Sequence, residues 1–144
     1  MRLGPRLIGA ALLAALGLAA SPALADPCKA VPDRGPLPAF LASGRTFEGP
    51  VVYVGDGDSL CVAVGQGAGQ WVEVRLADFY AAELSAPGGR EAKAALERIA
   101  KDRRAVCRAQ RRSYDRIVAR CTIGGVSIGE RMRRAGVREG GNGR

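Results

Sequence analysis

The fold is decided by residues 46–79, which read TFEGPVVYVGDGDSLCVAVGQGAGQWVEVRLADF. Three short runs rich in β-branched and aromatic residues, 46–54, 59–64 and 70–79, are separated by GDGD and GQGAG. Runs bounded by Gly and Asp predict strands, and the glycine-rich second turn predicts a hairpin. In the third run, valine and leucine alternate with Glu73 and Arg75, as in a strand buried on one face. The stretch therefore predicts three consecutive strands.

The pattern turns helical at residues 87–102, PGGREAKAALERIAKD, where apolar positions recur at helical spacing: Ala92, Ala95, Leu96 and Ile99. Two further strand-like runs follow, RAVCRAQ (104–110) and RIVARCTI (116–123), joined by RRSYD. A short last helix is predicted in VSIGERMRRAG (126–136), capped by Ser127 and burying Ile128 and Met132.

Three strands, a helix, two strands and a helix predict an α+β domain built on a five-stranded barrel of the OB type. An open α+β sandwich would give a similar string, so the pattern leaves both topologies open. We expect the barrel domain to span residues 46–138. A proline-rich extended lead would precede it at 26–45, and a flexible tail would follow at 139–144.

The first 25 residues have the three parts of a secretory signal peptide: a basic start, an apolar middle and an A-x-A end. A membrane anchor is the alternative, but the apolar run is shorter than the roughly 20 residues that a span needs. We expect cleavage after Ala25 and export to the periplasm or the medium. We expect a monomer with no stable membrane association after cleavage.

The chain is basic, with 22 Lys and Arg against 14 Asp and Glu and a formal charge of +8. Residues 1–25 carry two arginines and no acid, so the charge is +6 without them. Most of the basic residues are arginines, many of them between 103 and 138, and arginine suits bidentate contact with phosphate. The charge favours a polyanionic partner, although a solvated basic face would account for part of it.

The four cysteines are Cys28, Cys61, Cys107 and Cys121, an even number in a chain predicted to be exported. Without histidine or a C-x-x-C pair, this favours disulfides over metal ligation. Four cysteines allow three pairings. Cys107 and Cys121 lie symmetrically about Tyr114, as facing positions of a hairpin do, which leaves Cys28 for Cys61.

The absence of histidine excludes a Ser-His-Asp triad, a Cys-His pair and a His-bound zinc. What remains is a set of carboxylates and arginines: Asp56 and Asp58 in VGDGDSL, Arg75 and Glu83 in VRLADFYAAEL, and Tyr114 and Arg116 in RSYDRIVAR. Hydrolysis of a phosphodiester asks for oxygen ligands for a hard cation, a base for water, and arginines for the charge on phosphate. Taken singly, each motif has a structural explanation, such as a turn for D-G-D.

The order and spacing of these motifs resemble the thermonuclease family, the staphylococcal-nuclease-like OB-fold nucleases, across roughly residues 48–137. Members of that family carry DGDT, VRLxGIDxPE and DxYGRxxA in this order. The resemblance implies that Arg75 and Arg116 bind the scissile phosphate and that Glu83 acts as general base or orients water. It also implies that Asp58 is a calcium ligand with Asp56 close by, and that Tyr114 packs against the nucleotide. The implied substrates are DNA and RNA, cut with little sequence preference.

The chain departs from the family pattern at the metal site. Tyr80 stands where the family has its second carboxylate ligand, and Ala82 replaces the proline before Glu83. A tyrosine is neutral at pH 7 and a poor ligand for calcium. Asp78 would replace the lost ligand only if the loop bulged, because two residues of strand span nearly 7 Å. We therefore expect a weakened calcium site.

Two further departures lie at the second arginine: Asp115 replaces the glycine before Arg116, and Arg112 stands where the family often has Asp. Three interpretations follow. The first is an exported, calcium-assisted nuclease, and the second is a non-catalytic OB module that binds nucleic acid or another polyanion. The third is a structural or partner-binding envelope protein.

Overall fold

The computed structural model describes residues 26–140, so the predicted signal peptide and residues 141–144 lie outside the described part. The elements are η1 (Ala39–Leu41), β1 (Thr46–Val54), β2 (Ser59–Ala63), η2 (Ala68–Gln70), β3 (Trp71–Leu76), α1 (Gly89–Ala100), β4 (Arg104–Ser113), β5 (Arg116–Ile123), β6 (Val126–Ser127) and α2 (Ile128–Arg134). Their order matches the predicted string, with one additional short strand, β6.

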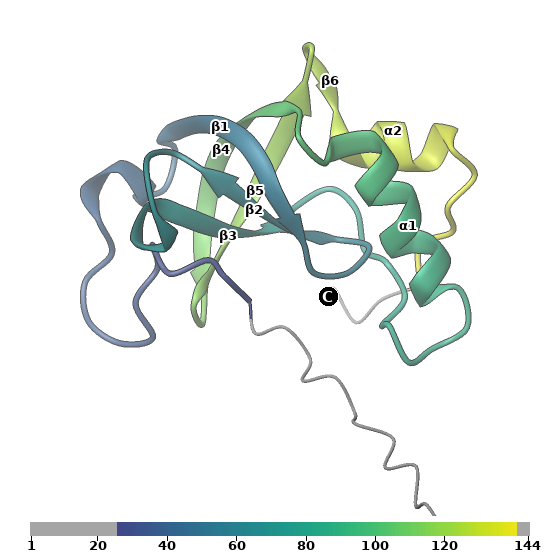
Figure 1. The fold of residues 1–144 in the computed structure, drawn as a ribbon, viewed down its shortest axis with the longest axis horizontal. Coiled ribbons are helices and arrows are strands. Elements are labelled where there is room, and N and C mark those ends of the chain that lie inside the picture. Colours follow the sequence, from purple (N-terminus) through teal and green to yellow (C-terminus); the bar gives the residue numbers. More distant parts are fainter. Residues whose placement is uncertain (1–25, 141–144) are drawn as a thin grey trace, which may run out of the picture.

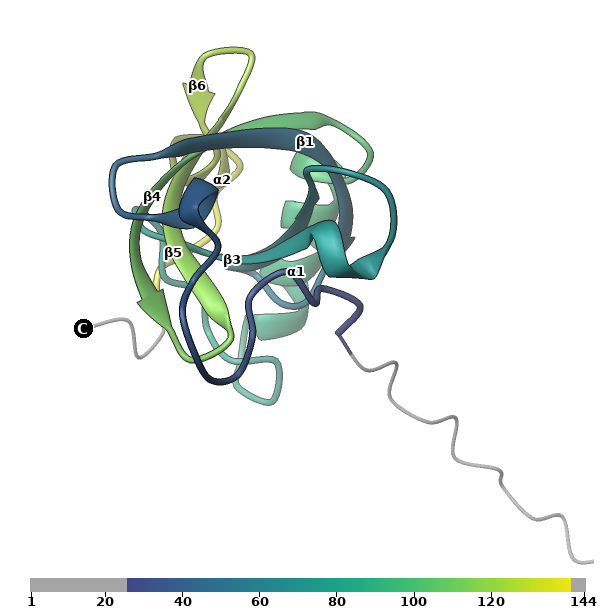
Figure 2. The same ribbon diagram turned by 90° about the vertical axis from the view of Figure 1, so that its left-hand side faces the viewer.

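The strands form one closed barrel (Figures 1 and 2). The sheet runs in the order β3-β2-β1-β4-β5-β6, and a parallel pairing of β3 with β5 closes it. All the other pairings are antiparallel. The closure confirms the OB-type barrel and excludes the open sandwich.

Two strands carry register shifts that help them to bend around the barrel. The shift in β1 lies between Val51 and Tyr53, and the shift in β4 lies between Ala109 and Arg111. An extra residue in one strand of a pair increases its local twist and bend. Since β1 and β4 each pair with two neighbours, these bends let both strands serve two parts of the ring.

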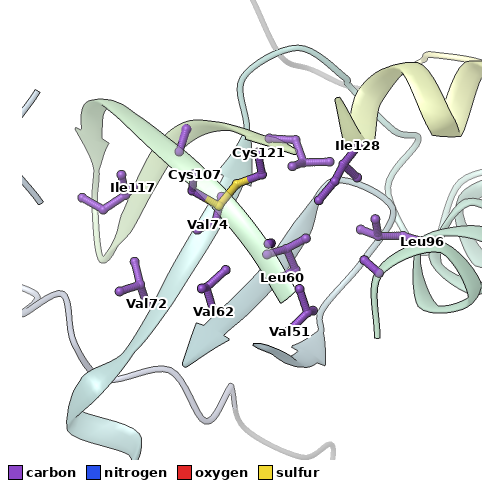
Figure 3. Close-up of a cluster of buried hydrophobic side chains, with 14 of the residues drawn as sticks. Val51, Leu60, Val62, Val72, Val74, Leu96, Cys107, Ile117, Cys121 and Ile128 are labelled. Atoms are coloured by element: carbon purple, nitrogen blue, oxygen red, sulfur yellow. A yellow bond between two sulfur atoms is a disulfide. The ribbon is translucent and has the colours of Figure 1, made fainter. Parts of the chain in front are cut away.

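The core fills the barrel with the inward-facing residues of each strand (Figure 3). In β3, Val72, Val74 and Leu76 are fully buried, as their alternation predicts. Leu96 of α1 and Ile128 of α2 are also fully buried at the end of the barrel that both helices cover (Figures 1 and 3). The helices therefore close one mouth of the barrel.

Both predicted disulfides form. Cys107 and Cys121 are directly opposite each other on β4 and β5, with Cα atoms 4.0 Å apart, and both side chains are buried in the core. Cys28 is bonded to Cys61 of β2, with Cα atoms 5.9 Å apart. Two disulfides are typical of proteins from oxidising compartments.

The lead at 26–45 lies against the barrel as an irregular segment with one 3-10 turn, η1. Its backbone donates hydrogen bonds from Lys29 to Ala68 (2.9 Å) and from Ala30 to Trp71 (3.0 Å), and Leu41 is buried in the core. Arg112 donates to the carbonyls of Pro32 and Gly35. Arg112, which stands where the family pattern often has Asp, therefore holds the lead against β4.

The first two residues of the segment predicted for the final helix, Val126 and Ser127, form the short strand β6. Gly124 and Gly125 have φ values of 58° and 77°, and Ile123 pairs with Val126 across them. Two consecutive positive φ values suit a two-residue hairpin turn, and glycine adopts them without strain. The chain therefore turns back for two residues before α2 begins. Ser127 caps α2 as predicted, its hydroxyl accepting a hydrogen bond from the N–H of Glu130 at 3.2 Å. Among the helices of residues 26–140, none has the length and apolar character needed to cross a bilayer.

Candidate active site

Three segments that carry the predicted site residues come together through the strand pairings of β2, β3 and β5. The turn between β1 and β2 carries Asp56 and Asp58, and the residue after them, Ser59, pairs with Arg75 of β3. Arg75 in turn lies beside Val118 of β5, two residues after Arg116. Asp58, Arg75 and Arg116, which are 17 to 58 positions apart in the sequence, therefore occupy one region of the barrel wall.

Asp58 is the most buried carboxylate of this region, with 4% of its surface exposed. Its Oδ2 lies 3.6 Å from Nη2 of Arg75 and accepts a hydrogen bond from the N–H of Ala81 at 3.0 Å. Asp56 supports the same turn, because its Oδ1 accepts hydrogen bonds from the N–H of Asp58 (3.1 Å) and the hydroxyl of Ser59 (2.6 Å). The turn and the loop after β3 are thus joined through Asp58.

The two carboxylates differ in acidity. Burial, together with the charge of Asp56, raises the pKa of Asp58 to about 7, although Arg75 opposes the rise. Burial also acts to raise the pKa of Asp56, but hydrogen bonds from Ser59 and from the N–H of Asp58 outweigh it, and the net pKa is lowered. With these pKa values the half-buried Asp56 stays ionised at neutral pH, and the buried Asp58 can bind a proton near pH 7.

Gly57 allows the turn to lie where it does. A Cβ atom at this position would come within 2.5 Å of the Cβ atoms of Ala81 and Ala92. The backbone between the two aspartates therefore packs directly against the loop after β3 and against α1. Glycine is required here for close approach rather than for an unusual φ.

Tyr80 lies beside Arg75. The guanidinium carbon of Arg75 is 5.8 Å from the centroid of the Tyr80 ring, and the phenol donates a hydrogen bond to the carbonyl of Ala77 at 3.4 Å. The ring therefore offers Arg75 a cation–π contact at the position where the family pattern has a carboxylate.

Residues of the predicted tail hold the backbone of Tyr80. Its N–H donates to Oε1 of Glu139 at 3.1 Å, and its carbonyl accepts from the N–H of Gly140 at 3.0 Å. Glu139 also pairs with Arg133 at 3.3 Å. The first two residues of the predicted flexible tail are thus bound to the loop. A contact across 59 residues leaves no local pattern in the sequence.

Asp78 is bound to other parts of the fold. Its Oδ2 accepts a hydrogen bond from the hydroxyl of Ser127, the residue that caps α2, and lies 3.9 Å from Nε of Arg120. The backbone carbonyl of Asp78 accepts from Arg133. Asp78 therefore joins the loop after β3 to the start of α2, and it serves the fold.

Glu83 lies on an exposed part of the loop, and among residues 26–140 it forms no ion pair within 4.0 Å. Its backbone is fixed more firmly than its side chain. Its carbonyl accepts from the N–H of Ala86 at 2.9 Å, and a Cβ on Gly89 would lie 1.9 Å from the same oxygen. The structure places Glu83 on the loop of Tyr80 and Ala81 but brings its carboxylate into no ion pair with Arg75.

Arg116 lies next to a carboxylate that the sequence analysis missed. Val74 pairs with Ile117, which brings the preceding residues, Glu73 and Arg116, side by side on the outer face. Burial first, and then the hydrogen bond and charge of Asp26 and the charge of Asp115, raise the pKa of Glu73 to about 8, while Arg116 lowers it. The alternation of residues 71–76 predicts that Glu73 faces outward. It does not predict its neighbours Asp26 and Asp115, because they come from distant segments.

Tyr114 stands at the tip of the hairpin between β4 and β5. Ser113 pairs with Arg116, so Tyr114 and Asp115 form a two-residue turn. Tyr114 has a φ of 57° and 84% of its surface is exposed. A non-glycine residue with positive φ costs roughly 1–2 kcal/mol. The hairpin thus presents an aromatic ring to solvent next to Arg116.

One further cluster contains potential metal ligands. Asp26, Cys28 and Cys61 bring ligand atoms within 4.8 Å of one another. The two sulfur atoms are bonded to each other, so neither is a thiolate that could bind a metal. The cluster is a disulfide with a carboxylate beside it.

Fold and site together define a class: an OB-type barrel with paired aspartates and two arginines on one part of its wall. No family model matches the chain, and no curated protein is significantly similar to it.

Proposed function

We propose that the protein is an exported nuclease that hydrolyses phosphodiester bonds of DNA and RNA with little sequence preference, assisted by calcium. The observation that carries the proposal is the buried carboxylate of Asp58 at 3.6 Å from Arg75. A buried anion beside a cation at a strand end is suited to holding a metal ion next to a bound phosphate.

The roles follow from chemistry and position. Arg75 and Arg116, on adjacent strands, would neutralise the charge that develops on the phosphate in the transition state. Glu83 would take a proton from the attacking water or orient it, which requires its exposed side chain to turn toward the substrate. Tyr114 would stack on a base, a contact that tolerates any sequence.

The aspartate pair fits a hard divalent cation. The contacts of the Asp58 carboxylate with Arg75 and Ala81 both fall on Oδ2, and the carboxylate of Asp56 is close enough to raise the pKa of Asp58. Asp58 and Asp56 would hold the ion, and water and substrate phosphate would complete its shell of six to eight oxygens. When bound, calcium supplies positive charge to the phosphate. Tyr80 contributes no anionic ligand, which makes the proposed site weak.

A non-catalytic module that binds nucleic acid is the second candidate. Two contacts favour it: the Tyr80 ring lies beside Arg75, and the carboxylate of Glu73 lies beside Arg116. Catalysis needs both arginines, and these contacts compete with the substrate phosphate for them. Polyanion binding by the exposed arginines would persist in spite of these two contacts.

Digestion of single-stranded DNA and RNA by the purified protein, with calcium or with a chelator, tests the proposal. We expect calcium-dependent cutting that drops by a factor of about 10² or more in Arg116→Ala and Glu83→Ala variants. Glu97→Ala, an exposed change on α1, is the matched control. Absence of cutting at millimolar calcium, with salt-sensitive binding retained, would favour the binding module.

A further inference from the structure

The outer face of β1, β4 and β5 carries a row of polar and basic side chains that the proposed active site does not use. Thr46 of β1 pairs with Arg108 of β4, and Arg108 pairs with Arg120 of β5. Both arginines are exposed, whereas their neighbours along the strands are buried, so they point outward. The row crosses three adjacent strands.

The arginine pair is costly for the isolated protein. Directly opposite residues on antiparallel strands have Cβ atoms about 5 Å apart, and like charges in such a pair are destabilising. Within residues 26–140, Arg108 has no carboxylate within 4.0 Å, and Arg120 has only Asp78, at 3.9 Å. A bound anion would relieve this repulsion.

The same face is hollowed. A depression of about 320 Å³ is lined by Thr46, Val106, Arg108, Gln110, Arg120 and Thr122. Val106 is 39% exposed and gives the depression an apolar contribution. Arginines around an exposed apolar side chain suit a chain that carries both phosphates and flat bases.

The row runs beside the proposed active site. Val118 pairs with Arg75 on one side and with Arg111 on the other, and it lies two residues before Arg120. Two residues of strand span about 7 Å. The pairings therefore give two neighbouring rows on one face, Arg75–Val118–Arg111 and Arg120–Arg108–Thr46.

We propose that Arg108 and Arg120 form an extended subsite that binds the phosphodiester backbone of single-stranded nucleic acid beyond the cleavage position. The inference relies on the proposed function only for where cutting occurs, since binding along this face does not require catalysis. The substrate class is accordingly a polymer of several nucleotides. A single nucleotide held by Arg75 and Arg116 would not reach this subsite.

Binding of labelled oligothymidylate to the purified protein, in chelator and at several salt concentrations, tests the subsite. The probes are a single thymidylate and an oligomer of about twenty nucleotides. We expect the R108Q/R120Q variant to bind the longer probe about tenfold more weakly. Its slope of log affinity against log salt should be shallower by about 1.4, as for two lost phosphate contacts with a single strand. The shorter probe should lose much less affinity.

The control is R98Q/R103Q, which removes the same charge from exposed positions at the end of α1 and just after it. An equal loss of affinity in both double variants, or no loss in R108Q/R120Q, would overturn the subsite. Cutting by the wild-type protein separates the two proposals. If it binds but never cuts and R108Q/R120Q alone loses affinity, the subsite stands and the nuclease fails. If it cuts and R108Q/R120Q binds normally, the nuclease stands and the subsite fails. If it neither binds nor cuts, both fail.

Discussion

At the scale of single residues, two side chains decide how well the proposed site works, Tyr80 and Glu73. Tyr80 places a neutral ring against Arg75, where a carboxylate would add a ligand for the cation. Glu73 places an acid next to Arg116, within reach of Asp26 and Asp115. Both side chains lie beside arginines that are assigned to phosphate binding, and the effect of each can be tested by one substitution.

Tyr80→Asp should strengthen calcium binding. The new carboxylate would give the Asp58 site a further anionic oxygen, and we expect at least about a tenfold tighter dissociation constant for calcium. Isothermal titration calorimetry measures this without an activity readout. Tyr80→Asn, which removes the ring without adding charge, is the control. Equal affinity in the Asp and Asn variants would contradict the assignment of this position to the metal site.

Glu73 should make the protein less stable as pH rises. Its pKa in the folded protein is about 8, above its ordinary value of 4.5. Between these values the folded state holds a proton that the unfolded state has lost, so the free energy of unfolding falls as pH rises. Asp58, with a pKa of about 7, acts in the same direction. Urea denaturation at pH 4.5 and pH 8 should show a smaller decrease in Glu73→Gln than in the wild type or in Glu97→Gln. The same decrease in all three proteins would contradict this account.

At the scale of elements, close packing of glycine backbone fixes the loops that carry the site. Gly57 lies against Ala81 and Ala92, and Gly89 lies against the carbonyl of Glu83. These contacts join the β1–β2 turn, the loop after β3 and α1. The positions of Asp58 and Glu83, the predicted site residues on these loops, therefore depend on two glycines that have no side chain.

Gly57→Ala should destabilise the protein by about 1–3 kcal/mol, because the added methyl group would overlap two alanine side chains in a packed region. Chemical denaturation measures the change. Gly69→Ala is the matched control, since a Cβ at Gly69 meets no atom within 4 Å and its φ is not positive. If both substitutions have the same effect, the close approach at Gly57 is not what requires glycine.

Local patterns explain why most elements could be predicted from the sequence. Alternation in residues 71–76 and the helical spacing of Ala92, Ala95 and Leu96 each reflect one buried face. The short strand β6 was not predicted, because it depends on Gly124 and Gly125 forming a turn that pairs Val126 and Ser127 with β5. A glycine pair indicates a break in structure but does not say whether the chain turns back.

At the scale of the whole molecule, the barrel and the proposed site both depend on contacts between residues far apart in the sequence. Such contacts are the hardest features to predict from the sequence. The β3–β5 pairing that closes the barrel joins residues 43 positions apart, Val74 and Ile117. The same pairing brings Glu73 to Arg116, and the C-terminal segment brings Glu139 to Tyr80. Residue identities indicated which side chains could carry chemistry. The residues that alter the charge or position of these side chains, such as Asp26 at Glu73 and Glu139 at Tyr80, come from segments with no sequence pattern of their own.

The buried disulfide should contribute strongly to overall stability. The loop between Cys107 and Cys121 has a sequence separation of 14. By the chain-entropy model, a bridge of that length stabilises the fold by about 3 kcal/mol. The C107A/C121A variant should lose about that amount in denaturant unfolding, measured with the Cys28–Cys61 bond kept oxidised. A loss below about 1 kcal/mol would show that the cross-link does little for the barrel.

A single rate measurement decides whether Asp58 and Arg75 form a phosphodiesterase site. It is the rate at which Asp58→Asn, compared with the wild type, cuts a labelled single-stranded oligonucleotide at saturating calcium. This nearly isosteric change removes the buried anion. We expect the rate to fall by a factor of about 10² or more, while affinity for the oligonucleotide in chelator stays within about twofold. An unchanged cutting rate in Asp58→Asn, or a wild-type protein that binds the strand and never cuts it, would contradict the account.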